Sequence, residues 1–134
     1  MTSEQKVEIK RGLRDVYIDR TKSSFIDGKI GKLLYRGINI DDLAQHSTFE
    51  ETIYLLMYSE LPTQPQLDAF NAELIASRAL PEDILSLIEI VKASHPMDVL
   101  RTAISALSAF DPDTEDNSTE ATLRKGIRLT AMAP

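Results

Sequence analysis

The chain has 134 residues, of which 43% are hydrophobic and 27% are charged, a composition typical of a folded globular protein. Its formal net charge is −6, so a phosphate backbone would be repelled and we expect no nucleic-acid partner. Cysteine is absent, which excludes disulfides, thiolate nucleophiles and sulfur-ligated metals and suits a cytoplasmic location. No apolar run of the sequence is long enough to span a membrane, so we expect no membrane partner.

The first part of the chain carries strand-like patterns. Residues 1–12 are predicted to be a disordered or extended tail, and residues 13–37 a small β-hairpin segment in which apolar and polar residues alternate. The apolar members of this pattern are Val16, Ile18, Phe25, Leu33 and Tyr35. We therefore expect two or three short strands before residue 38.

Two glycines lie between the last two of these strands, in the stretch DGKIG. A phosphate-binding loop needs more glycines, or a Gly-Lys-Ser/Thr run that opens a helix. Because a strand pattern follows Gly31, we interpret Asp27-Gly28 and Gly31 as the turn of a hairpin in which glycine adopts a positive φ.

Residues 38–134 are predicted to be helical. The predicted helix starts are Asn39, Thr48 with Glu51, Thr63 with Gln66, Pro81, Pro96, and Asn117 or Ser118. The residues expected to face the core are Phe49, Ile53, Leu56, Met57, Leu67, Phe70, Leu74, Ile84, Leu87, Ile88, Val91, Leu100, Ala103, Ile104, Leu107, Phe110, Leu123, Ile127 and Met132. The predicted fold class is therefore mainly α, a multi-helix bundle preceded by a small N-terminal β-hairpin.

The run LRTAISALSAF at residues 100–110 alternates small and large side chains. Small side chains on more than one face of a helix allow neighbouring helices to approach closely. This pattern predicts a helix that lies either in the centre of the protein or in a subunit interface.

The two histidines and the acidic stretch are the remaining candidates for chemistry. His46 is predicted at a helix end and His95 at a helix N-cap, and neither has the neighbouring ligands that a metal site needs. We interpret both as structural, although His95 could also meet an anionic ligand. The carboxylates Asp111, Asp113, Glu115 and Asp116 are interpreted as a solvated loop, because no apolar neighbours raise their pKa values and no glycine completes a calcium loop.

Several short motifs follow one another in a specific order: IDG, YRG, DLA, STFEE, LPT and HPMD. In this order and spacing they resemble the N-terminal part of the citrate synthase family, which includes the 2-methylcitrate synthases. The resemblance covers about residues 12–134. It implies that residues 38–134 form the incomplete N-terminal part of a helical citrate synthase-like large domain.

The resemblance also implies a reaction, the condensation of acetyl-CoA with oxaloacetate to give citrate and CoA, with propionyl-CoA as the acyl donor in 2-methylcitrate synthases. A carboxylate and two histidines carry the acid–base chemistry in such enzymes. The family's catalytic segments are similar to HGGA, GHR and VDF or VDL, and none of these occurs in residues 1–134. We therefore assign no catalytic, cofactor-binding or metal-binding residue, and we expect the chain to be inactive alone.

The same resemblance implies partners. It predicts a homodimer, or a multiple of one, through the helices at about residues 96–110 and 118–134, which agrees with the small-residue pattern. The isolated chain is expected to self-associate or to be poorly stable, because apolar faces lack their covering helices. In some hexameric members the HPM region contributes to a nucleotide regulatory site, which makes nucleotide binding near His95 a hypothesis.

Three interpretations stay open from the sequence. No stop signal follows the last predicted helix, which favours the N-terminal part of a longer citrate or 2-methylcitrate synthase. The second interpretation is a standalone helical association module derived from that family. The third is a relative that cleaves citryl-CoA, and the residues present do not separate acetyl-CoA from propionyl-CoA.

Overall fold

The computed structural model describes Gly12 and residues 16–134 of the chain, and most of this part is helical. Three short strands come first: β1 (Ser24–Asp27), β2 (Lys32–Tyr35) and β3 (Ile38–Asn39). Six helices follow: α1 (Ile40–His46), α2 (Phe49–Tyr58), α3 (Gln64–Ala76), α4 (Glu82–Val91), α5 (Pro96–Leu107) and α6 (Thr119–Met132). The predicted class, mainly α with an N-terminal hairpin, is confirmed. The predicted tail lies outside the described residues, apart from Gly12.

The strands form one antiparallel sheet in the order β1-β2-β3, with Ser24 opposite Tyr35. In the β1–β2 turn, Gly31 has a φ of 66°, so a glycine takes the left-handed conformation as the sequence predicts. The second turn was not predicted. Arg36 and Gly37 have φ values of 49° and 90°, and two positive φ values are what a two-residue type I′ hairpin requires.

The strand pattern expected around Val16 and Ile18 is wrong. Residues 16–23 have no regular structure, and Tyr17 is 97% exposed. The alternation of apolar residues is present, but no described strand lies alongside it to accept its backbone hydrogen bonds, and an unpaired strand is not stable in water.

The helix starts follow the predicted capping residues closely. The Asn39 side chain accepts a hydrogen bond from the Asp41 N–H at 3.2 Å. At the start of α2, the Glu51 carboxylate accepts from the Thr48 N–H at 2.6 Å and the Thr48 hydroxyl accepts from the Glu51 N–H at 3.2 Å, a complete capping box. Pro81 lies one residue further out than predicted, at the N-cap of α4.

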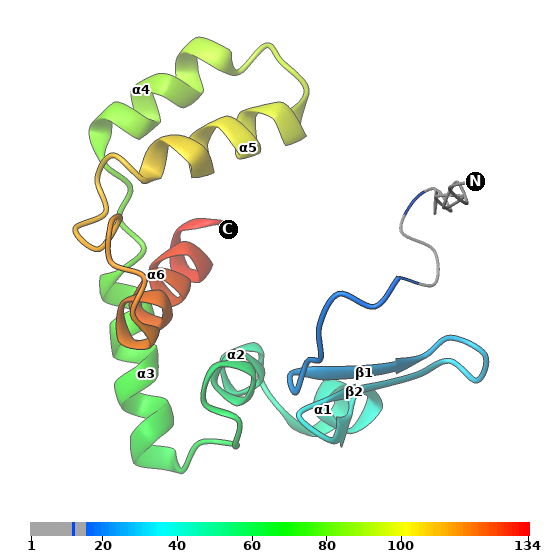
Figure 1. Ribbon diagram of the computed structural model, residues 1–134. Coiled ribbons are helices and arrows are strands. Elements are labelled where there is room, and N and C mark those ends of the chain that lie inside the picture. The colour runs from blue at the N-terminus through cyan, green and yellow to red at the C-terminus, as the bar shows by residue number, and fades with distance from the viewer. Residues whose placement is uncertain (1–11, 13–15) are drawn as a thin grey trace, which may run out of the picture.

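The helices pack around two separate hydrophobic clusters. The first joins α2, α3 and α6 and consists of Ile53, Tyr54, Phe70, Leu74 and Ile127. The second joins α4 and α5 and consists of Ile84, Ala103 and Leu107. Figure 1 shows α4 and α5 as a helical hairpin at one end of the molecule and the sheet with α1 at the other, with α2, α3 and α6 between them.

Several predicted core residues are exposed instead. Phe49 is 66% exposed, and Leu100, Ile104 and Phe110 are 39%, 38% and 45% exposed. Helical periodicity correctly places these side chains on apolar faces, but within residues 16–134 no other element covers those faces fully.

Candidate functional site

The sequence-predicted candidates lie far apart in the fold. His46 is the last residue of α1 and is exposed, whereas His95 caps the start of α5, where its Nδ1 accepts a hydrogen bond from the Met97 N–H at 3.2 Å. The structural role predicted for His95 as an N-cap is therefore confirmed. α1 and α5 lie in different parts of the molecule, so the two histidines do not form one site (Figure 1). Within residues 16–134, no group of three or more histidines and carboxylates is placed to hold a metal ion.

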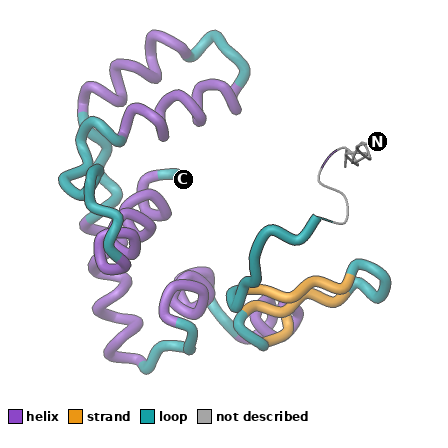
Figure 2. The backbone as a smooth tube through the Cα atoms, in the orientation of Figure 1, coloured by secondary structure: helices purple, strands orange, loops and turns teal. Residues whose placement is uncertain are grey.

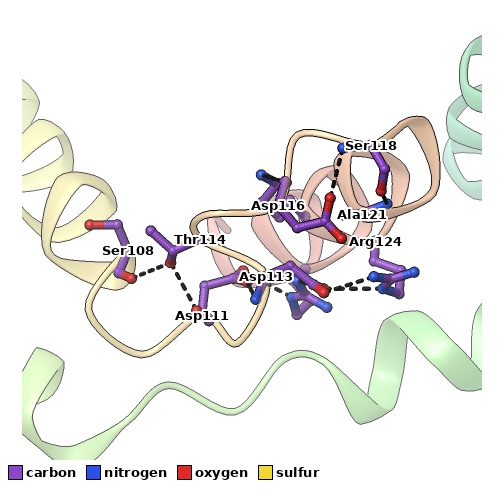
Figure 3. Close-up of polar contacts among 10 residues, drawn as sticks. Ser108, Asp111, Asp113, Thr114, Asp116, Ser118, Ala121 and Arg124 are labelled. Carbon is purple, nitrogen blue, oxygen red and sulfur yellow. Dashed lines mark hydrogen bonds and ion pairs between the residues drawn. The ribbon is translucent and has the colours of Figure 1, made fainter.

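The loop between α5 and α6 differs from the solvated acidic loop that the sequence predicts. Figure 2 shows that this connection is a long loop, and Figure 3 shows its polar contacts. Asp111 and Asp113, which the sequence predicted as solvated carboxylates, are partly buried: their side chains are 18% and 17% exposed. Both bind arginines of α6.

The geometry of these ion pairs is bidentate. Arg128 donates to both oxygens of Asp111 at 2.8 and 3.0 Å, and Arg124 donates to both oxygens of Asp113 at 2.7 and 3.1 Å. Arg128 also donates to Asp113 at 2.6 Å, so the four side chains form one network. We call Asp111, Asp113, Arg124 and Arg128 the aspartate–arginine clasp. Bidentate guanidinium–carboxylate pairs are the most geometrically specific ion pairs in proteins.

Further polar contacts hold the same loop. The Thr114 hydroxyl donates to the Asp111 carbonyl at 2.8 Å, and Lys125 of α6 donates to the Asp116 carbonyl at 2.6 Å. The Asp116 carboxylate accepts from the Ser118 N–H at 2.8 Å, and Ser118 is the N-cap of α6, where its hydroxyl accepts from the Ala121 N–H at 3.2 Å. The loop is therefore attached to α6 along most of its length.

The clasp lowers the pKa values of its carboxyl groups. For Asp113, hydrogen bonds from Arg124 and then from Arg128 hold the pKa well below the usual aspartate range. For Asp111, burial alone would raise the pKa, but the hydrogen bonds from Arg128 and from the Asp113 N–H outweigh it, so the pKa is lowered. These groups stay ionised at neutral pH and are not suited to donate protons.

The free energy of unfolding is expected to fall as the pH drops below about 4, the pKa of aspartate in an unfolded chain. A carboxyl group with a depressed folded-state pKa stabilises the fold fully above its unfolded pKa, and this contribution is lost as the pH falls through the folded-state value. Asp113→Asn should therefore be less stable than the wild type at neutral pH and lose less stability on acidification. Urea unfolding at several pH values measures this, and parallel pH profiles for the two proteins would contradict it.

An apolar cavity of about 250 Å³ lies beside the clasp, between the C-terminal part of α5, the loop and α6. Its wall includes Ile104, Phe110, Leu129 and Met132, and Arg128 of the clasp lies at its polar edge. The charged residues of this wall, Asp111, Lys125 and Arg128, are engaged in the contacts described above, so its chemistry is that of a packing surface.

The outer face of α5 is also apolar. Met97, Leu100 and Ile104 are spaced three and four residues apart, so they lie on one face of the helix, and they are 62%, 39% and 38% exposed. We call these three residues the α5 stripe. Ala103 and Leu107 lie next to this stripe on the same side of α5, and they are buried against α4. The apolar face of α5 therefore has one edge that is buried and one that is uncovered, and an uncovered apolar surface of this kind is typical of an association surface.

Comparison with known proteins decides the family. A family model described as "Citrate synthase, C-terminal domain" matches residues 12–134, almost the whole chain. The chain belongs to the citrate synthase family.

Individual relatives agree with this assignment. The citrate synthase of Haloferax volcanii is 45% identical over 132 residues, 95% of this chain and 35% of that protein. The 2-methylcitrate synthase of Mycobacterium tuberculosis is 40% identical over 134 residues, 99% of this chain and 34% of that protein. The solved citrate synthase structure from Pyrobaculum aerophilum has a TM-score of 0.85 and 32% identity over 96% of this chain and 38% of that one. This citrate synthase family chain thus spans about a third of the length of the relatives it matches.

The resemblance stated from the sequence motifs is therefore confirmed at the level of the family. Sequence reasoning missed the clasp of this citrate synthase family chain, because Asp111 and Arg128 are 17 residues apart. The sequence pattern that could have indicated the clasp is the pair Arg124 and Arg128, one helical turn apart, together with the Asp-Pro-Asp run of the preceding loop. Among the described residues, no helix is long and apolar enough to cross a membrane.

Proposed function

We propose that the chain is the N-terminal third of a citrate synthase-type acyltransferase, which condenses acetyl-CoA with oxaloacetate to give citrate and CoA. The observation that supports this best is the 45% identity to a citrate synthase over nearly the whole chain, together with the 35% coverage of that relative. The chain carries no catalytic, cofactor-binding or metal-binding residue in this proposal. Its role is to build the helical scaffold on which the remaining two-thirds of the enzyme assemble.

The second part of the proposal is a homodimer. The α5 stripe and the exposed Leu129 of α6 offer apolar surface at the two helices that we expect in the subunit interface. Small exposed residues near the stripe, such as Ser108 at the C-cap of α5, allow a partner helix to approach closely. Association through these helices would cover apolar surface that the monomer leaves in water.

A 2-methylcitrate synthase is the first alternative, because a protein of that name is 40% identical over 99% of this chain. The two activities differ in the acyl group, acetyl or propionyl, and the proposal assigns no residue of this chain to that group. A standalone helical association module is the second alternative, and it is favoured by the same exposed face of α5 without requiring any catalysis.

Thiol release separates these functions. The chain has no cysteine, so a thiol reagent detects only CoA freed from acetyl-CoA or propionyl-CoA in the presence of oxaloacetate. The 134-residue chain is expected to give no release above the blank. The coding sequence past Pro134 is then determined, and the protein encoded by the whole reading frame is expected to release CoA. Faster release from acetyl-CoA would indicate a citrate synthase, and faster release from propionyl-CoA a 2-methylcitrate synthase.

Two results would contradict the proposal. CoA release by the 134-residue chain itself would show that catalytic groups are present where we assign none. A stop codon directly after Pro134 would rule out catalysis of the condensation by this chain and leave the association module as the function.

A further inference from the structure

The two hydrophobic clusters divide the helices into two packed units. One unit contains α2, α3 and α6, and the other contains α4 and α5. Residues 77–81 and 108–118 are the covalent links between them. Met132, near the end of α6, is the residue of the first unit that packs against the second cluster.

The contact between the two units is incompletely filled. The apolar cavity of about 250 Å³ lies where the C-terminal part of α5 faces α6. This cavity is about half open to solvent, so the side chains that line it lack part of the van der Waals contacts that would otherwise fix the two helices relative to each other. Apolar packing alone therefore leaves the position of the α4–α5 unit weakly determined.

The aspartate–arginine clasp acts at this same place. Asp111 and Asp113 belong to the link that leaves α5, and both are held by arginines of α6, in the other unit. The link is also braced towards α5, because the Thr114 hydroxyl shares its one proton between the carbonyls of Ser108 and Asp111 in a bifurcated hydrogen bond. A continuous series of polar contacts thus runs from the end of α5 to the middle of α6 (Figure 3).

We propose that the clasp is a salt-sensitive latch that fixes the α4–α5 unit against α6. While the latch is closed, the link between α5 and α6 is attached to α6 and the cavity beside it keeps its shape. When the ion pairs open, the link becomes free and the α4–α5 unit moves about its two connections. The inference concerns the position of α5 in this chain and does not depend on the reaction proposed above.

Electrostatics makes the latch responsive to ionic strength. The clasp is partly open to water, since the side chain of Arg124 is 47% exposed, so dissolved ions reach it. The Debye length falls to about 3 Å at 1 M salt, which weakens the attraction between the carboxylates and the guanidinium groups. Asp116 and Glu120 also face Arg124, so screening acts on a local group of charges and not on a single pair.

Distance measurement between the two units tests the latch. The absence of cysteine allows spin labels at Ala72→Cys in α3 and Ser86→Cys in α4, both at exposed positions. At low salt a single narrow distance distribution is expected. At 1 M salt, where the Debye length is about 3 Å, the distribution should broaden and gain longer distances. The Arg124→Gln/Arg128→Gln variant should show the broad distribution already at low salt and respond little to added salt.

A matched control removes two other cations from exposed ion pairs. Lys92→Gln and Arg101→Gln break the pairs with Glu89 in α4 and Asp98 in α5, which do not connect the two units. This control should keep the narrow distribution at low salt. The proposal is overturned if the wild-type distribution is the same at low and high salt, a test that holds even if the double arginine variant does not fold. Equal distributions for that folded variant and the wild type would overturn it as well.

Discussion

Replacing Phe70 with alanine is expected to lower the free energy of unfolding by about 3–5 kcal/mol, the usual loss when a buried aromatic side chain is truncated. Phe70 is 3% exposed and lies at the centre of the first cluster. Its ring meets that of Tyr54 edge-on at 5.4 Å between centroids and that of Tyr58 at 6.1 Å. The substitution removes both aromatic contacts and leaves a cavity between α2 and α3.

Urea unfolding followed by near-ultraviolet circular dichroism measures this loss, because the two tyrosines that contact Phe70 contribute to the signal. Phe49→Ala is the matched control: the same atoms are removed from a side chain that is 66% exposed, and a change within about 0.5 kcal/mol is expected. Phe70→Leu keeps most of the side-chain volume, and it replaces the alanine variant in the experiment if that variant does not fold. Equal losses of unfolding free energy for Phe49→Ala and Phe70→Ala would show that the contact between α2 and α3 does not form part of the hydrophobic core.

Introducing glutamate at Leu100 and Ile104 is expected to raise the dissociation constant of the proposed homodimer by about 100-fold or more, because two charges would be buried in its apolar interface. Both residues belong to the α5 stripe and are more than a third exposed in the monomer, so the fold of a single chain should tolerate the change. Sedimentation equilibrium of the 134-residue chain over a range of concentrations measures the association.

The control for this experiment is Ser105→Glu together with Arg101→Glu. Both positions are exposed on α5, but they lie outside the α5 stripe. This variant should still form the dimer. A wild-type chain that stays monomeric at high concentration would contradict the association that we propose, whatever the variants do.

Local features of the fold could be predicted from the sequence because they depend on neighbouring residues. The caps at Asn39 and Thr48 form hydrogen bonds within two or three residues, and the sequence places both correctly. His95 at the start of α5 is a further example, since a residue before proline is biased away from the helical conformation. The order of motifs gave the family, and with it the helical class.

Features that depend on distant residues could not be predicted. The clasp joins Asp111 to Arg128, and no local rule indicates that a run of acidic residues will fold back on the following helix. Periodicity marked Ile104 and Phe49 as members of apolar faces, but it cannot tell whether another element covers them. The turn at Arg36-Gly37 was missed because arginine is uncommon at positive φ.

The uncovered apolar surface also bears on how the chain behaves in a cell. Large side chains such as Phe49, Ile90 and Met97, each more than 60% exposed, are the kind of surface that chaperones and proteases recognise in unassembled proteins. Binding of a partner to this surface stabilises the chain by mass action. The abundance of the chain is therefore expected to follow the supply of its partner, so that copies made in excess are degraded.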